Sequence, residues 1–266
     1  MTGTILDKIF TDKRARVDAA KRSSDPVALR ELALQARSER RAYQFRDSLS
    51  DHSKINIIAE FKRASPSKGV INDGVDPADI ARQYEVGGAA AISVLTEEDH
   101  FKGSLDDLRA VRAAVNRPIL RKDFLFDEFQ VYEAAVAGAD AILLIAAMLE
   151  DEEIVRLRWI AEDELGMDAL VEVHTLNELL RIENTGAKLI GVNNRDLKTF
   201  DVTLDVSREL IHHAPEGAIM IAESGLQTRE DIVELNGLGY LGFLIGETLM
   251  RTGDPAAELR RLHDAG

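Results

Sequence analysis

The sequence predicts an α/β fold, a (β/α)8 TIM barrel, and three observations indicate it. Short apolar runs recur along the chain from Ile55 onward. Several of them begin shortly after a glycine, and glycine just past a helix adopts the left-handed cap conformation that other residues resist. The runs are apolar on both faces, as the strands of a buried parallel sheet must be.

Eight of these runs are candidate strands. Their starts lie near Ile55, Ala89, Pro118, Ala139, Asp168, Lys188, Ala218 and Leu241. The starts are spaced about 27 residues apart on average, which suits a unit of one strand, one helix and two loops. Eight such units favour a closed barrel, and an open doubly wound sheet is the alternative.

Helix starts between the strands carry capping signals. Asp76-Pro77 places proline in a first helical turn. Thr175 with Glu178, and Thr228 with Asp231, resemble capping boxes. The acidic run 150–153 is typical of the first turn of a helix that ends near residue 166.

Residues 1–50 precede the repeating pattern. Helical spacing is seen in five apolar residues, Ile5, Leu6, Ile9, Phe10 and Val17. Asp25-Pro26 begins a second helical stretch. Because this segment is too short to hold its own core, we expect a helical extension packed on a barrel of residues 51–266, within one structural domain.

Composition excludes several classes of function. The chain has 266 residues, a formal net charge of −14 and no cysteine, so nucleic-acid or anionic-membrane surfaces, disulfides and thiolate metal sites are not expected. Residues 1–25 interleave charged and apolar side chains without the apolar core of a signal peptide. The longest apolar run, Ala141 to Leu149, is far too short to cross a bilayer. We expect a cytoplasmic protein.

The active site of such a barrel lies at the carboxyl ends of its strands. Four ionisable residues stand near the ends of the first, third, fifth and seventh predicted strands: Glu60, Lys122, Glu172 and Glu223. Alternate strands contribute to one layer, so these groups, with Lys62 beside them, are expected to converge and to shift each other's pKa values for acid–base chemistry. The alternative is that each is an ordinary solvated charge.

The last two strand ends indicate a phosphate site. Residues 223–225 and 245–247 each bring a glycine and free backbone N–H groups toward a helix start. An acidic Glu247 is unfavourable beside a phosphate unless only its backbone faces the ligand. The six histidines show no metal-ligand spacing, so no metal site is predicted.

Seven motifs carry a resemblance to a known family. They are IIAEFKRASPSKG (57–69), LTEEDHFKGS (95–104), LRKDF (120–124), LVEVH (170–174), GVNNRDL (191–197), IAESG (221–225) and FLIGETLM (243–250). On these motifs the sequence strongly resembles the indole-3-glycerol phosphate synthases, enzymes of the tryptophan pathway. The resemblance covers almost the whole chain, including residues 1–50, which the family places over the barrel mouth.

The resemblance implies a reaction and a small-molecule phosphorylated substrate. In it, 1-(2-carboxyphenylamino)-1-deoxyribulose 5-phosphate closes to indole-3-glycerol phosphate with release of CO₂ and water. No metal or organic cofactor is implied. The sequence does not indicate whether the chain associates with other enzymes of the pathway.

The resemblance also implies roles for individual residues. Lys122 is the expected general acid at the substrate carbonyl, and Glu172 is its partner in later proton transfers. The position of these two and of the pair Glu60 and Lys62 leaves open which group handles which proton. The expected orienting groups are Asn193, Glu223 and Ser224. The expected phosphate and carboxylate contacts are Arg63, Ser65, Arg195, Gly225 and Gly246, with Glu247 where many relatives have serine. The expected apolar walls are Phe101, Phe124, Leu143 and Leu197.

Two other functions remain open from the sequence. Another phosphate-binding barrel enzyme, such as the isomerase of the preceding pathway step, would share the site after the last two strands. It would not need Glu60, Lys62, Lys122 and Glu172 together. A catalytically silent sensor of the phosphorylated ligand should have lost one of these acid–base residues, and none is missing.

Overall fold

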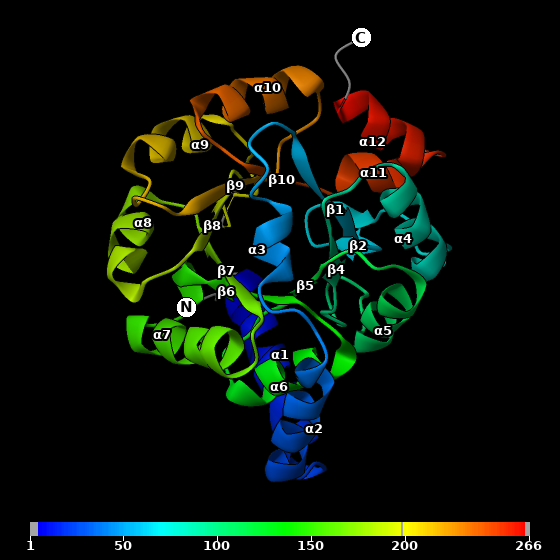
Figure 1. Cartoon of the computed structure of the whole chain (residues 1–266), viewed down its shortest axis with the longest axis vertical. Helices are drawn as coiled ribbons and strands as arrows, with labels where there is room; N and C mark the ends of the chain where they lie inside the picture. Colours follow the sequence, from blue (N-terminus) through cyan, green and yellow to red (C-terminus); the bar gives the residue numbers. More distant parts are fainter. Residues whose placement is uncertain (1–4, 198, 264–266) are drawn as a thin grey trace.

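Eight parallel strands close into a barrel (Figure 1). This computed structural model describes residues 5–197 and 199–263. The barrel strands are β1 (Asn56–Phe61), β4 (Ala91–Leu95), β5 (Ile119–Lys122), β6 (Ala141–Ile145), β7 (Asp168–Val173), β8 (Leu189–Asn193), β9 (Ile219–Glu223) and β10 (Gly242–Ile245). Each pairs with the next along the chain, and β10 returns to β1. The predicted closed barrel is confirmed, and the open sheet is excluded.

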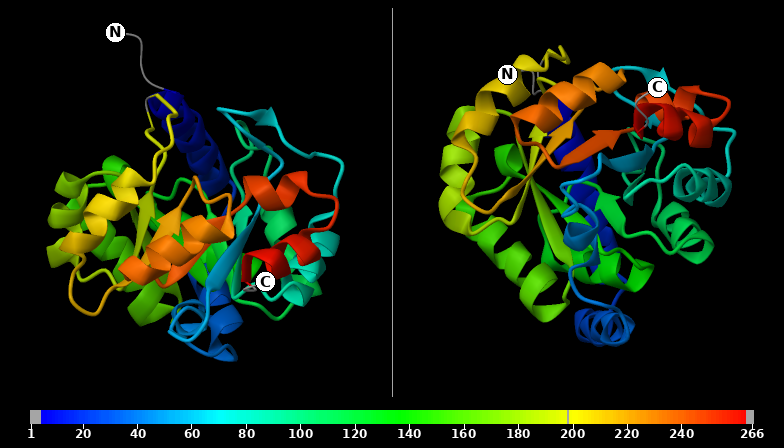
Figure 2. Two further views of the ribbon diagram at one scale, coloured as in Figure 1. Left: turned by 90° about the horizontal axis from the view of Figure 1, so that it is seen from above. Right: turned by 45° about the horizontal axis from the view of Figure 1, so that its top comes forward.

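A ring of helices surrounds the barrel (Figure 2). The helices that follow β1 are α4 (Pro77–Val86), α5 (Leu105–Ala114), α6 (Glu128–Ala137), α7 (Asp151–Trp159), α8 (Leu176–Ile182), α9 (Asp205–Leu210), α10 (Arg229–Leu238), α11 (Glu247–Arg251) and α12 (Pro255–His263). Shorter turns are η1 (Ala146–Met148), η2 (Ile160–Glu164), η3 (Glu183–Thr185) and η4 (Ile211–His213), and a small hairpin joins β2 (Ala64–Ser65) to β3 (Gly69–Val70). The strands are buried between this ring and the barrel interior, so their apolar side chains face both ways.

The helix caps agree with the sequence signals at most positions. Asp76 accepts hydrogen bonds from the first backbone N–H groups of α4, and Thr228 with Asp231 forms a complete capping box on α10. The predicted capping box of Thr175 and Glu178 is only partly present. Its hydroxyl accepts the Glu178 N–H at 3.2 Å, but the Glu178 carboxylate accepts the N–H of His174 at 2.7 Å. Glu178 is therefore tied to the end of β7 rather than to the cap residue.

The N-terminal segment holds the barrel at both ends. It forms α1 (Ile5–Arg22), α2 (Pro26–Ser38) and α3 (Gln44–Ser48). In Figure 1, α3 lies across the near end of the barrel while α1 lies behind it, and in Figure 2 α1 and the α2–α3 segment lie at opposite ends. α2 packs along α6 on the side of the ring. Of these three helices, only α1 covers the end that carries the candidate site.

α3 closes the amino-terminal end of the barrel interior. Its Phe45, together with Leu49 just after it, is fully buried in the cluster that fills the barrel, which includes Ile58, Leu120 and Leu170. Three hydrogen bonds tie this segment to strand starts: Tyr43 N–H to the Gly166 carbonyl, Arg46 N–H to the Asp168 carboxylate and the Asn56 amide to the Leu49 carbonyl. The expectation that residues 1–50 as a whole cover the mouth is therefore wrong for α3.

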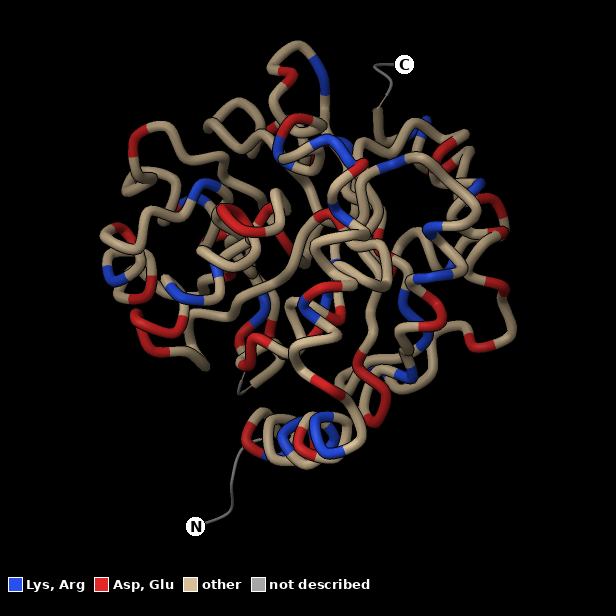
Figure 3. Tube along the Cα trace, turned by 60° about the horizontal axis from the view of Figure 1, so that its bottom comes forward, with Lys and Arg blue, Asp and Glu red and all other residues tan. Residues whose placement is uncertain are grey.

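Charge is spread over the outside of the molecule. In the view of Figure 3, acidic and basic residues are interspersed along the helices and loops. In the described part of the chain, no helix combines the length and apolarity needed to span a membrane.

Candidate active site

A cavity of about 770 Å³ opens at the carboxyl ends of the strands, where the sequence predicted the site. Nearly all of the predicted site residues line it. They are Glu60, Lys62, Ser65, Phe101, Lys122, Phe124, Leu143, Glu172, Asn193, Arg195, Leu197, Glu223, Ser224, Gly225, Gly246 and Glu247. The volume lies within the range of about 300–1,000 Å³ that is usual for small-molecule sites.

Three alternate strands bring one ammonium group between two carboxylates. Lys122 Nζ, at the end of β5, donates to Glu172 Oε2 on β7 at 2.9 Å and lies 3.0 Å from Glu223 Oε2 on β9. The amide of Asn193 on β8 donates to the other oxygen of Glu172 at 3.2 Å. On β1, Glu60 Oε1 lies 2.6 Å from Lys62 Nζ. The predicted convergence of odd-strand side chains is therefore seen in the fold.

Burial and charge set the protonation of this cluster. Burial lowers the pKa of Lys122, but Glu172 and Glu223 outweigh it and raise that pKa, so the ammonium is retained. Burial raises the pKa of Glu172, but Lys122 and His174 hold it well below its usual range. Burial dominates at Glu223 and, with the charge of Glu172, raises its pKa to about 8. These shifts favour the ionised form of Glu172, the protonated form of Glu223 and the ammonium form of Lys122.

Two glycines make room for the carboxylates. A Cβ on Gly191 of β8 would lie 2.1 Å from Glu223 Oε1. A Cβ on Gly246, after β10, would lie 2.4 Å from Glu60 Oε1. A side chain at either position would have to displace the acid, so glycine leaves the two carboxylates room to lie where they do.

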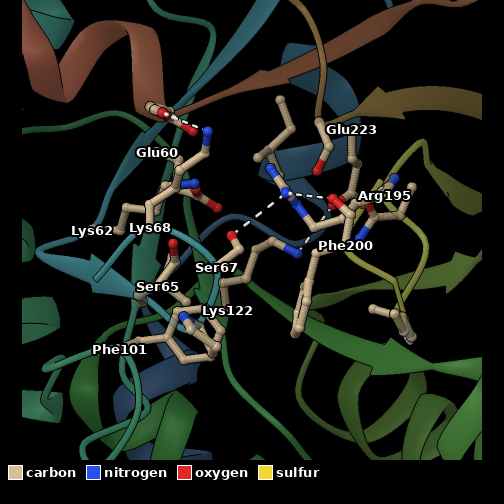
Figure 4. A pocket seen from close by; sticks show the side chains of 18 of the residues that line it. Glu60, Lys62, Ser65, Ser67, Lys68, Phe101, Lys122, Arg195, Phe200 and Glu223 are labelled. Atoms are coloured by element: carbon tan, nitrogen blue, oxygen red, sulfur yellow. Dashed lines mark hydrogen bonds and ion pairs between the residues drawn. The ribbon is translucent and has the colours of Figure 1, made fainter. Parts of the chain in front are cut away.

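The turn after β9 has features typical of an anion site. Ser224 and Gly225 both have positive φ, at 62° and 81°, in the turn after β9. A non-glycine residue in that conformation is strained and is typical of functional sites. Arg195 donates to the carbonyl of Phe200 at 3.2 Å and faces Ser67 Oγ at 3.5 Å across the cavity (Figure 4).

Glu247 does not present an unpaired charge to this region. Its Oε1 accepts from Arg251 Nε at 3.1 Å and lies 3.8 Å from Lys68 Nζ. The two cations offset a carboxylate that would be unfavourable beside a phosphate by itself. Gly246, Glu247 and Thr248, at the start of α11, line the cavity.

Apolar side chains form the remaining wall. The rings of Phe101 and Phe124 lie 6.1 Å apart, and Leu143 and Leu197 line the same cavity. α1 adds an apolar edge that was not among the predicted site residues, through Ile5, Leu6 and Ile9. An aromatic ring would be enclosed here between rings and aliphatic groups.

Arg63 is the predicted residue that does not join the site. Its guanidinium forms a two-bond ion pair with Asp107 of α5 and stacks over Phe61, and it does not line the cavity. The physical reason is that consecutive residues after a strand point in different directions. Lys62 pairs with Glu60 inside the mouth, whereas Arg63 points toward the helical ring.

Some neighbours of the site have no role predicted from the sequence. His174 is part of a quoted motif, and its ring lies against Glu172. Ser67 and Lys68 belong to the first motif and line the cavity. The positions of His174, Ser67 and Lys68 within these motifs are the sequence signal that could have identified them as neighbours of the site. In the described residues, no group of three or more histidine, aspartate or glutamate side chains is arranged to hold a metal ion.

Comparisons with known proteins show the family. A family model described as indole-3-glycerol phosphate synthase matches residues 6–262. The chain is 47% identical to the indole-3-glycerol phosphate synthase of Carboxydothermus hydrogenoformans over 97% of its length and 98% of the relative's. It is 46% identical to the enzyme of the same name from Neisseria meningitidis serogroup B, with the same coverage.

Solved structures show the same fold at low sequence identity. The 3-hexulose-6-phosphate synthase of Salmonella typhimurium aligns with a TM-score of 0.63 and 13% identity, over 78% of this chain and 96% of that one. The thiamine phosphate pyrophosphorylase of Pyrococcus furiosus aligns with a TM-score of 0.59 and 17% identity, over 79% and 94%. At such identities the likeness supports the barrel alone.

Proposed function

The chain belongs to the indole-3-glycerol phosphate synthase family, carboxy-lyases of tryptophan biosynthesis, and we propose how the residues of its barrel mouth divide the reaction among themselves. The observation that carries this proposal is the position of Lys122 Nζ between Glu172 and Glu223, at 2.9 and 3.0 Å. A buried ammonium held by carboxylates is a proton donor that needs no metal.

Lys122 acts first, as the general acid. As the aromatic carbon that bears the carboxylate bonds to the substrate carbonyl carbon, Lys122 gives its proton to the carbonyl oxygen, which becomes a hydroxyl group. Loss of CO₂ then returns an electron pair to the ring and restores its aromaticity. Glu172, as the ionised carboxylate, can receive a proton from the substrate or from Lys122, since its Oε2 is hydrogen-bonded to the same ammonium.

Loss of water completes the indole. The leaving hydroxyl needs a proton and a neighbouring ring atom must lose one, so an acid and a base are required in the same small space. Lys122 with Glu172, and Lys62 with Glu60, are the two available pairs. Asn193, Glu223 and Ser224 orient the substrate between them.

The rest of the cavity binds the two ends of the substrate. We place the phosphate at the backbone of Gly225 and Gly246, with Arg195 and Ser65 as the polar side chains near it. The carboxyphenyl ring lies against the apolar wall of Phe101, Phe124, Leu143 and Leu197. Arg63 has no direct contact in this proposal, because Asp107 holds it.

Product formation tests the proposal. The purified protein is mixed with 1-(2-carboxyphenylamino)-1-deoxyribulose 5-phosphate, and indole absorbance or fluorescence is followed. We expect turnover without added metal or cofactor. Tight binding of the substrate without product would instead support a catalytically silent sensor.

We also propose a cytoplasmic location and a small-molecule substrate as the main partner. Membership of a family of biosynthetic barrel enzymes supports the location, and the net charge of −14 makes a nucleic-acid partner unfavourable. Cell fractionation tests the location, and recovery of the protein in a membrane fraction would contradict it.

A further inference from the structure

His174 lies directly behind the reactive cluster. It follows the last residue of β7, and its side chain is 8% exposed. Its ring nitrogen Nε2 lies 3.2 Å from Glu172 Oε1, and Nδ1 lies 3.4 Å from Glu178 Oε2. Lys122 holds the other oxygen of Glu172. The Glu172 carboxylate therefore has a nitrogen base on one side and the ammonium of the site on the other.

The backbone fixes the ring in this place. The N–H of His174 donates to Glu178 Oε2 at 2.7 Å, and Thr175 caps the same turn of α8 through the Glu178 N–H. Main chain and ring of His174 are thus both held by the first turn of α8. Glu178 does not complete the predicted capping box because its carboxylate accepts the N–H of His174 instead.

The ring is charged at neutral pH. Burial lowers the pKa of His174, but the carboxylates of Glu172 and Glu178 outweigh it and raise that pKa to about 9. The charge of His174 in turn helps to hold the pKa of Glu172 below its usual range. A neutral ring in the same place would leave Glu172 with the cost of its own burial and one fewer cation.

We propose that His174 is a positioning residue of the reaction, whose imidazolium holds one oxygen of Glu172 so that the carboxylate stays ionised and its other oxygen stays on Lys122. This inference rests on the proposed roles of Lys122 and Glu172. His174 lies outside the lining of the substrate cavity and lines a second cavity of about 920 Å³ beside it. Its contribution is therefore to kcat more than to KM.

Other charged groups around His174 belong to several elements. Glu172 comes from β7 and Glu178 from α8. The second cavity is also lined by Asp7 of α1 and by Arg195, Asp196 and Asp201 of the segment after β8. Across Glu172 lie Lys122 of β5 and Glu223 of β9. The substitutions that test His174 leave all of these groups in place.

A matched pair of variants separates the hydrogen bond from the charge. His174→Gln places an amide near the position of Nε2, so it can still donate to Glu172 without a charge. His174→Asn is shorter and places its amide near Nδ1, away from Glu172. We expect kcat to fall about 10-fold in H174Q and about 100-fold in H174N, as for loss of a hydrogen bond to a charged group, with KM changed less than about threefold.

The pH profile gives a readout that a structural role would not move. Removing the imidazolium raises the pKa of Glu172, so the acidic limb of the kcat profile should move to higher pH in both variants. In labelled wild-type protein, one imidazole NMR signal should titrate near pH 9 and be absent from H174Q. His212→Gln, an exposed histidine between α9 and β9, serves as the control and should leave rate and profile unchanged.

The outcomes distinguish this inference from the proposed function. If Glu172→Gln is inactive while folded H174N keeps its kcat within twofold and the same acidic limb, the inference fails and the proposed roles stand. If Glu172→Gln keeps full activity, the proposed roles fail first. A His174 signal that titrates at or below the ordinary histidine pKa of about 6.5 would also overturn the inference.

Discussion

At the scale of single residues, the groups within a few ångströms of each carboxylate in the barrel mouth set its pKa. Glu172 and Glu223 have the same side chain and share Lys122, yet the pKa of Glu172 is lowered and that of Glu223 is raised. The difference lies in their second neighbours, because Glu172 has His174 beside its other oxygen, whereas Glu223 faces the charge of Glu172. The sequence predicts that these acids converge, but not which one keeps its proton.

Glu223 makes the stability of the protein depend on pH. A carboxyl group whose pKa is higher in the folded than in the unfolded state contributes stability that is complete below about pH 4.5 and is lost as pH rises through about 8. Glutamine cannot ionise, so the Glu223→Gln variant does not lose this stability as the pH rises. We therefore expect the melting temperature of E223Q to rise relative to the wild type between about pH 5 and pH 9.

Thermal unfolding at several pH values checks this. Glu216→Gln, an exposed residue before β9, serves as the control and should show a constant difference. A difference between E223Q and the wild type that does not change with pH would show that Glu223 is ionised at neutral pH.

The sequence does not separate the roles of Lys62 and Arg63. Lys62 and Arg63 are neighbours in one motif, and nothing local separates their roles. Lys62 forms an ion pair with Glu60, two residues earlier in the chain. Arg63 forms one with Asp107, 44 residues further along. Only the packing of α5 against the barrel determines that difference.

At the scale of elements, local signals predict the long strands and helices well. Each predicted strand start lies within a few residues of the observed one, because buried parallel strands have distinctive apolar runs. α3 was not predicted. It has five residues, begins after Tyr43 in a left-handed conformation and has no side-chain cap. So short a helix depends on its contacts with the barrel rather than on its own propensity.

Gly191 of strand β8 leaves room for the Glu223 side chain of the neighbouring strand β9. A methyl group at Gly191 would lie 2.1 Å from Glu223 Oε1, so Gly191→Ala should push Glu223 away from Lys122. We expect kcat to fall by about 10-fold or more, as when a catalytic group is misplaced by about an ångström.

Gly237→Ala in α10 is the matched control, because a Cβ at this position would have nothing within 4 Å of it. This variant should keep full activity and be more stable by up to about 1 kcal/mol, since alanine favours a helix. Steady-state kinetics and unfolding of both variants test this. Full activity in Gly191→Ala would contradict the proposed position of Glu223.

At the scale of the whole molecule, the N-terminal segment joins both ends of the barrel. α1 lines the mouth and α3 fills the opposite end, while α2 is fixed by Arg37, which pairs with Asp140 at 3.1 Å. The sequence predicts that this segment is helical and packs on the barrel. It does not predict the division between two ends, because that depends on where the chain crosses the outside of the ring.

The contribution of α3 to this arrangement can be measured as stability. Phe45→Ala should lower the free energy of unfolding by about 3–5 kcal/mol, because it opens a cavity in the fully buried barrel interior. Leu32→Ala on α2 is the control, since that side chain is 53% exposed and its loss should change stability by at most about 0.5 kcal/mol. Urea unfolding measures both. Equal small effects would show that α3 does not support the barrel.

In the proposed reaction, Lys122 is the acid of ring closure. Single-turnover ring closure with folded Lys122→Met tests this most directly, because methionine keeps much of the aliphatic length and removes the proton. Lys62→Met is measured beside it. We expect substrate binding to persist in K122M and the rate of ring closure to fall by at least about 10²–10⁴-fold. A rate near that of the wild type in K122M would contradict the assignment and transfer the acid role to Lys62.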